Sequence, residues 1–94
     1  WSIFFDNEIR LCDPVFGRCI FVHEVENLKD ITKLLSPSNQ VVGLNIDSYR
    51  REEIAKIFLQ CGVSRISQIG KMANFTFPWD DIFPTEKLIR WAYA

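Results

Sequence analysis

Three thiols are the groups in this chain that could supply nucleophilic chemistry. They belong to Cys12, Cys19 and Cys61. A cysteine becomes reactive when a basic group or a helix N-terminus stabilises its thiolate. Cys61 follows a helical pattern at the opposite end, Cys19 begins a strand pattern, and Cys12 has only nearby arginines within reach. We therefore expect structural thiols and assign no catalytic residue.

His23 and an arginine pair are the other candidates for chemistry. Imidazole titrates near neutrality and can act as a general base, but His23 has neither a Ser-x-Gly elbow nor a loop cysteine beside it in the sequence. We expect a strand histidine held by a hydrogen bond. Arg50 and Arg51 lie near a predicted helix start and could hold a phosphate there. Pairing with Glu52 or Glu53 on a solvated helix face is the alternative that we favour.

Metal and phosphate-loop patterns are missing from the sequence. The cysteines show no Cys-x-x-Cys or Cys/His spacing, and the four glycines are scattered. Asp80 and Asp81 are adjacent, so their side chains seldom point at one substrate, and capping or turn formation explains them better. We expect no metal site.

The composition indicates a folded domain. Of 94 residues, 48% are hydrophobic and 24% are charged, and the formal net charge is −1. This balance gives no electrostatic reason to expect nucleic acid. Three cysteines without pairing signals favour reduced thiols and a cytoplasmic protein, and no apolar run is long enough to span a bilayer. The chain begins at Trp1 and its only methionine is Met72, so residues 1–94 are expected to form a single domain that is either a processed product or, the alternative that we favour, a piece cut from a longer protein.

Apolar alternation predicts an entry hairpin followed by strands and helices in turn. The hairpin comprises residues 1–5 and 8–12, joined by Asp6 and Asn7. Residues 19–25, 40–47 and 63–69 read as strands. Asn27 caps a first helix, Asp47 or Ser48 caps a second, and Gly62 ends the second. A last helix opens at Pro84 or Thr85, with an apolar side formed by Leu88, Ile89 and Ala92.

Two successive strand–helix–strand units favour a parallel sheet with right-handed crossovers. The expected fold class is therefore α/β: a small parallel or mixed sheet with flanking helices, built as a β-hairpin, a βαβαβ unit and a C-terminal helix.

The succession of motifs resembles the later part of the catalytic domain of the aldehyde dehydrogenase superfamily. It consists of Phe16-Gly17 and the strand after it, residues 25–31, 41–44 and 55–58, and the run 61–66. The ending is similar to the C-terminal region of LuxC-type acyl-CoA reductases, through Gly62-Val-Ser-Arg-Ile, Ile69-Gly-Lys-Met, Trp79-Asp-Asp and Leu88-Ile-Arg-Trp.

This resemblance implies a parent enzyme that reduces a fatty acyl thioester to an aldehyde with NADPH. In such enzymes a cysteine thiolate attacks the acyl carbonyl and releases CoA or a carrier thiol, and the acyl-enzyme then accepts hydride. The nucleophile and the nucleotide-binding domain of the family lie upstream of the matched region. The isolated chain is therefore expected to be inactive and to need no cofactor. Its expected partners are the upstream domains, the acyl-CoA or acyl-carrier thioester, and further subunits of a homo-oligomer.

The same resemblance suggests two cofactor-binding residues. In the superfamily an acidic residue two places before a Phe-Gly pair holds the nicotinamide ribose, and the Phe packs nearby. Phe16 fits this pattern, whereas position 14 is Pro14 and the nearest acid, Asp13, is one residue out of register. Arg18 also replaces the usual proline.

A second hypothesis belongs to a different class. The chain could be a small standalone α/β module for protein interaction or regulation, without catalysis. Exposed apolar surface discriminates the two hypotheses, because a part removed from a larger enzyme should expose the face that met the missing domain.

Overall fold

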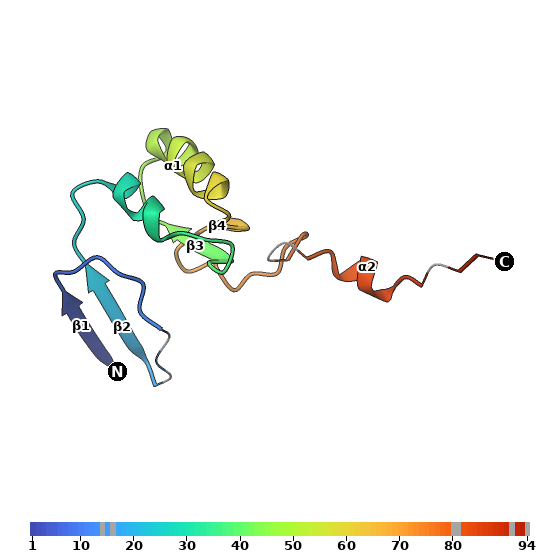
Figure 1. The fold of residues 1–94 in the computed structure, drawn as a ribbon, viewed down its shortest axis with the longest axis horizontal. Helices are drawn as coiled ribbons and strands as arrows, with labels where there is room; N and C mark the ends of the chain where they lie inside the picture. The colour runs from blue at the N-terminus through green and yellow to red at the C-terminus, as the bar shows by residue number, and fades with distance from the viewer. Residues whose placement is uncertain (14, 16, 80–81, 91, 94) are drawn as a thin grey trace.

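The computed structural model describes residues 1–13, 15, 17–79, 82–90 and 92–93. These residues form a small α/β structure drawn out along one axis, with extents of 61 × 35 × 23 Å (Figure 1). In chain order the elements are β1 (Ser2–Asp6), β2 (Cys19–His23), the 3-10 helix η1 (Leu28–Leu34), β3 (Val41–Leu44), α1 (Ser48–Gln60), β4 (Arg65–Gln68) and α2 (Pro84–Leu88).

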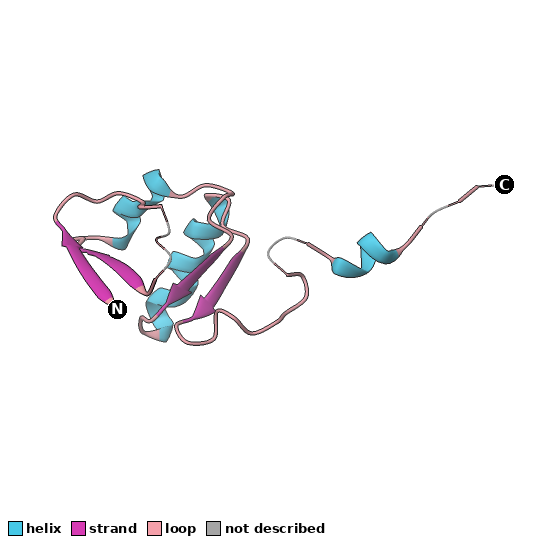
Figure 2. Ribbon diagram, turned by 90° about the horizontal axis from the view of Figure 1, so that it is seen from below, coloured by secondary structure: helices cyan, strands magenta, loops and turns pink. Residues whose placement is uncertain are grey.

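The β3–α1–β4 unit contains the core. β3 and β4 pair in parallel, from Val41 opposite Arg65 to Leu44 opposite Gln68, and α1 makes the connection between them. Figure 2 shows α1 alongside this pair of strands. The buried side chains come from β3, α1 and the turn before β4, and they are Leu44, Ile54, Phe58 and Val63. The predicted strand–helix–strand unit is confirmed here.

Residues at the helix ends behave as the sequence predicts. The Asp47 carboxylate accepts a hydrogen bond from the Arg50 backbone N–H at 3.0 Å and caps α1. At the other end Gly62 adopts a φ of +101°, which a residue with a Cβ adopts only at a cost. The Asn27 side chain caps η1 through the Lys29 backbone N–H at 2.9 Å, although this helix is of the 3-10 type.

The predicted entry hairpin is wrong. β1 pairs with β2 in parallel, from Ser2 opposite Cys19 to Asp6 opposite His23, and residues 8–12 form no strand. The predicted turn does form, because the Asp6 carboxylate accepts a hydrogen bond from the Glu8 backbone N–H at 3.0 Å. Instead of residues 8–12, β2 pairs with β1 over its whole length. The Phe21 ring also stacks on the Phe4 ring, with 5.3 Å between the ring centroids.

The predicted single sheet is also wrong, because the strands form two separate two-stranded parallel sheets. η1 packs against α1, and Leu28, Ile31 and Leu35 join the core around Phe58. The connection between β2 and β3 therefore carries the chain away from β2 into the second unit, and β3 pairs only with β4 among the described residues.

The last helix is shorter than predicted. α2 ends at Leu88 and Ile89 already has extended backbone, whereas the apolar pattern predicted continuation to Ala92. None of the α2 side chains is buried, and a helix of this length is marginal without packing. We refer to residues 71–79, 82–90 and 92–93 as the C-terminal arm, which projects from the body along the long axis (Figure 1).

Candidate functional site

An apolar groove lies beside the first sheet, between the chain that follows β1 and the helix η1. Its volume is about 250 Å³. Nine residues line it, of which seven are aliphatic: Ile9, Arg10, Leu11, His23, Val25, Leu28, Ile31, Leu34 and Leu35. We call it the Arg10–His23 groove, after the two polar side chains in its lining.

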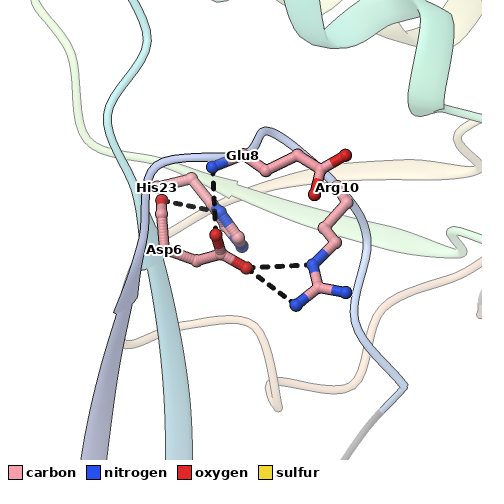
Figure 3. A network of polar contacts seen from close by, with 4 residues as sticks. All are labelled: Asp6, Glu8, Arg10 and His23. Atoms are coloured by element: carbon pink, nitrogen blue, oxygen red, sulfur yellow. Dashed lines mark hydrogen bonds and ion pairs between the residues drawn. The ribbon is translucent and has the colours of Figure 1, made fainter.

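The polar end of the groove is a small network centred on Asp6 (Figure 3). Arg10 donates to the Asp6 carboxylate through Nε at 2.9 Å and through Nη2 at 2.8 Å. The half-buried His23 ring places Nδ1 3.2 Å from the Asp6 carbonyl oxygen. Because that oxygen can only accept, Nδ1 carries the proton in this bond. The prediction that His23 is a strand histidine held by a hydrogen bond is confirmed.

The network favours the ionised form of Asp6. The hydrogen bond from the Glu8 backbone N–H, followed by the one from Arg10, lowers the pKa of Asp6 below its ordinary value. In return the Asp6 carboxylate raises the pKa of Arg10, and Cys12 adds a smaller electrostatic contribution in the same direction. One end of the otherwise apolar groove is therefore marked by the ion pair of Arg10 with Asp6.

This arrangement is suited to holding a chain, and it offers no activated nucleophile. Aliphatic walls remove an alkyl group from water at a gain of about 0.8 kcal/mol per buried methylene. A guanidinium at the end can orient a carbonyl or a negatively charged head group.

The three thiols are half-buried and free. Cys61 is the C-cap residue that follows α1, where its N–H bonds back to the helix and the helix dipole gives a thiolate no support. Cys19 lies 3.9 Å from the Gly17 carbonyl oxygen. Cys12 is the thiol with an electrostatic link to an arginine, Arg10.

Of the two predicted cofactor-binding residues, Asp13 lies in the part of the chain that the structure describes, and it is not part of the groove. Asp13 is exposed on the loop between β1 and β2 and is absent from the groove lining. Phe16 lies outside the described residues, so its predicted packing against a nicotinamide stays a prediction. An exposed carboxylate such as that of Asp13 has the chemistry to accept hydrogen bonds from ribose hydroxyls.

The two arginines at the start of α1 differ in their contacts. Arg51 donates through Nη1 to the Leu44 carbonyl oxygen at 3.1 Å and so ties α1 to the end of β3. Among the described residues neither arginine forms an ion pair with Glu52 or Glu53. The predicted pairing remains only as an electrostatic interaction, because the hydrogen bond from Lys29 and, as the smallest contribution, the charge of Arg50 lower the pKa of Glu53. Glu53 bonds to Lys29 at 2.6 Å, and Glu52 bonds to Lys56 at 2.8 Å.

Two further properties concern the part of the chain that the structure describes. It has no group of three or more His, Cys, Asp and Glu side chains placed to hold a metal ion. None of its helices has both the length and the apolar character required to cross a membrane.

The groove was not identified from the sequence, although part of its signal is visible there. Ile9 and Leu11 alternate, which led to the predicted hairpin, and Leu28, Ile31, Leu34 and Leu35 form the predicted apolar stripe of a helix. Residues 8–12 do not pair with β1, and Ile9, Arg10 and Leu11 line the groove together with residues of η1.

Comparison with protein families gives one match. The family described as acyl-CoA reductase (LuxC) matches residues 1–91. No curated protein and no solved structure matches the chain. The predicted LuxC likeness is confirmed, while the wider likeness to aldehyde dehydrogenases stays a prediction. Since the match extends over nearly the whole sequence, the chain belongs to the LuxC acyl-CoA reductase family.

Proposed function

We propose that this chain acts as the C-terminal part of an enzyme that reduces a fatty acyl thioester to an aldehyde with NADPH. The reaction runs through a cysteine acyl-enzyme whose nucleophile lies elsewhere in the protein, and the 94 residues alone are inactive. The observation that carries the proposal is the family match over residues 1–91. The contexts of Cys12, Cys19 and Cys61 support placing the nucleophile elsewhere, because none combines exposure with a strong cationic partner.

Within this enzyme, the Arg10–His23 groove receives part of the acyl chain. Support comes from its aliphatic lining and from its volume of about 250 Å³, which is below the usual range for a whole drug-sized ligand. The groove therefore suits a segment of chain. Asp6 holds Arg10 at the groove end through two hydrogen bonds, so the cation is positioned before a ligand arrives.

The proposed cofactor contacts are Asp13 and Phe16. The exposed Asp13 carboxylate can hold ribose hydroxyls, and bound NADPH supplies the hydride. The rest of the NADPH site, the CoA or carrier-protein site and the subunit contacts of a homo-oligomer belong to this proposal for the whole enzyme.

The test compares the natural gene product with the 94-residue chain. An antibody against this chain isolates the natural protein, whose intact mass is measured, and both proteins are assayed for NADPH oxidation with a fatty acyl-CoA. We expect a natural species several times heavier than 11.0 kDa that consumes NADPH, and no consumption by the chain alone. A natural species of about 11.0 kDa, or turnover by the chain alone, would contradict the proposal. The first result would favour the standalone interaction module.

The groove is tested in the same natural reductase by Leu34→Glu, with Lys33→Glu as the matched control. Leu34 lines the groove, whereas Lys33 is the exposed neighbour on the same helix. Losing contact with about two methylenes costs about tenfold in kcat/KM. We expect this loss for long acyl chains and little change for short ones. Equal losses for both chain lengths, or the same loss in Lys33→Glu, would remove the acyl chain from the groove.

A further inference from the structure

The His23 ring leaves one hydrogen-bond acceptor open to the Arg10–His23 groove. Its Nδ1 donates to the Asp6 carbonyl oxygen at 3.2 Å, so Nε2 of the neutral ring is an acceptor. Among the residues that the structure describes, no group donates to Nε2. No unpartnered side-chain nitrogen of a half-buried residue there is sealed from solvent. Because the ring lines the groove, a bound molecule can reach Nε2.

Arg10 supplies donors at the same end of the groove. Its Nε and Nη2 bond to the Asp6 carboxylate at 2.9 and 2.8 Å, and Figure 3 shows the guanidinium and the His23 ring beside the same Asp6 side chain. A guanidinium carries five N–H groups. In the described part of the chain, Nη1 of Arg10 has no acceptor. The end of the groove therefore offers a donor and an acceptor together.

This pair of groups selects the kind of polar group that an aliphatic ligand carries. A carboxylate would compete with Asp6 for Arg10 and would be repelled by the Asp6 charge. A carbonyl or ether oxygen accepts from Arg10 but leaves Nε2 of His23 without a donor. A hydroxyl group both donates and accepts, so it satisfies both side chains at once.

The size of the groove sets the length of the chain segment. An apolar cavity of about 150 Å³ holds benzene, which has six carbons. At the same density the groove, with a volume of about 250 Å³, holds about ten non-hydrogen atoms. This number corresponds to about nine carbons and one hydroxyl oxygen. The aliphatic wall on the side of η1 consists of Leu28, Ile31, Leu34 and Leu35.

The position of the thiols indicates which end of an acyl chain enters the groove. None of the three cysteines lines it, and the nucleophile of the proposed reaction lies elsewhere in the protein. The thioester carbonyl must meet that nucleophile. The groove is therefore suited to the end of the chain that is remote from the thioester.

We propose that the Arg10–His23 groove binds the remote end of a hydroxylated acyl chain, with the hydroxyl group donating to Nε2 of His23 and accepting from Arg10. This inference rests on the proposed function, in which the groove receives part of the acyl chain. It adds the substrate class, which is long acyl thioesters with a hydroxyl group at the end away from the thioester. A plain alkyl end contacts the same walls but leaves both polar groups without a partner.

The first test measures binding to the natural gene product without any reaction. Isothermal titration calorimetry compares nonan-1-ol with its isomer 1-methoxyoctane, which has the same number of atoms and no hydroxyl group. The comparison is repeated in His23→Asn, whose amide can still donate to the Asp6 carbonyl oxygen but lacks Nε2. Because 60% of the Arg10 side chain is exposed, water competes at this end. We expect a preference for the alcohol about fivefold larger in the wild type than in His23→Asn.

Two further variants separate the hydroxyl contact from the apolar walls. Leu34→Ala should weaken the binding of both isomers and leave their ratio unchanged, whereas Arg10→Met should reduce the preference for the alcohol. Circular dichroism establishes that each variant is folded. The same ratio in the wild type, His23→Asn and Arg10→Met would overturn the proposal. The absence of binding by either isomer would also overturn it, because another part of the protein would then fill the groove.

The second test compares 16-hydroxyhexadecanoyl-CoA with hexadecanoyl-CoA as substrates of the natural reductase. We expect kcat/KM to be about fivefold higher for the hydroxylated thioester, and His23→Asn to remove this difference. Reduction of both thioesters with equal kcat/KM would overturn the substrate class and leave the proposed function intact. Failure to reduce either one would overturn the proposed function and with it the substrate class, whereas the binding ratio decides whether the groove takes a hydroxyl group.

Discussion

The two sheets of this molecule each consist of two parallel strands, yet only one of them holds a core. β3 and β4 are joined through α1, which lies against them and buries Phe58 completely. Between β1 and β2 the described residues, 7–13, 15, 17 and 18, form no helix, and none of the side chains of the two strands is buried.

The difference shows that apolar strands do not create a core by themselves. β1 contains Ile3, Phe4 and Phe5, and its Phe4 stacks on Phe21, but a two-stranded sheet leaves most of each face to water unless a second layer covers it. In this chain the crossover connection supplies that layer for one sheet. The other sheet is available for a partner.

The largest expected effect comes from exchanging one phenylalanine in each sheet unit for alanine. Phe58 is fully buried and Phe5 is 65% exposed. Phe58→Ala should lower the free energy of unfolding by about 3–5 kcal/mol, since it removes buried area and leaves a cavity. Phe5→Ala should change it by no more than about 0.5 kcal/mol when the chain is dilute. Urea denaturation of both variants measures the difference.

If Phe58→Ala does not fold, Phe58→Leu provides the smaller step on the same scale. Equal losses for Phe58→Ala and Phe5→Ala would break the comparison, because the first sheet would then be as well packed as the second.

A second pair compares glycines beside the two sheets. Gly62 has a φ of +101°, and an added Cβ would come within 2.9 Å of the Pro37 backbone nitrogen; Gly17, before β2, has a φ of +116° and open space around it. Gly62→Ala should cost about 2–4 kcal/mol, from backbone strain and overpacking together. Gly17→Ala should cost about 1 kcal/mol, from strain alone.

Thermal unfolding of the two glycine variants, followed by circular dichroism, measures this second pair. Similar shifts in the two midpoints would mean that the contact with Pro37 is relieved by a small movement. The close packing of the β3–α1–β4 unit would then not include the turn before β4.

Local features were predictable from the sequence, whereas the pairing of strands was not. Asp47, Asn27 and Gly62 act within a few residues of their own position, so their side-chain types were sufficient to predict caps and a helix end. β1 had two possible partners with similar apolar alternation, residues 8–12 and 19–23. The choice depends on the ladder and on the Phe4–Phe21 stack, which bring together residues far apart in the sequence.

The candidate site shows the same limit. Asp13 and Phe16 were proposed from a local pattern, and no contact in the described residues tests them. Predicting the Arg10–His23 groove would have required knowing that β1 pairs with β2 and that residues 8–12 form no strand beside it. The apolar character of Ile9 and Leu28 is visible in the sequence, but the gap between them arises from the pairing of β1 with β2.

The smallest effect concerns the polar network at the end of the first sheet. The pKa of Asp6 is lowered mainly by the hydrogen bond from the Glu8 backbone N–H and next by the hydrogen bond from Arg10. The ionised carboxylate therefore stabilises the fold at pH values above the ordinary pKa of 3.8. This stabilisation is lost as the pH falls through the lower pKa of the folded state. In an NMR titration we expect the Asp6 carboxyl group to have a midpoint below 3.8. Arg10→Gln should raise the midpoint only partly, because the larger cause remains, and Glu8→Pro, which removes the N–H, should raise it more. If Arg10→Gln raised the midpoint more than Glu8→Pro, the ion pair with Arg10 would be the main cause of the lowered Asp6 pKa. That pKa would then rise with salt concentration, since exposed ion pairs are screened.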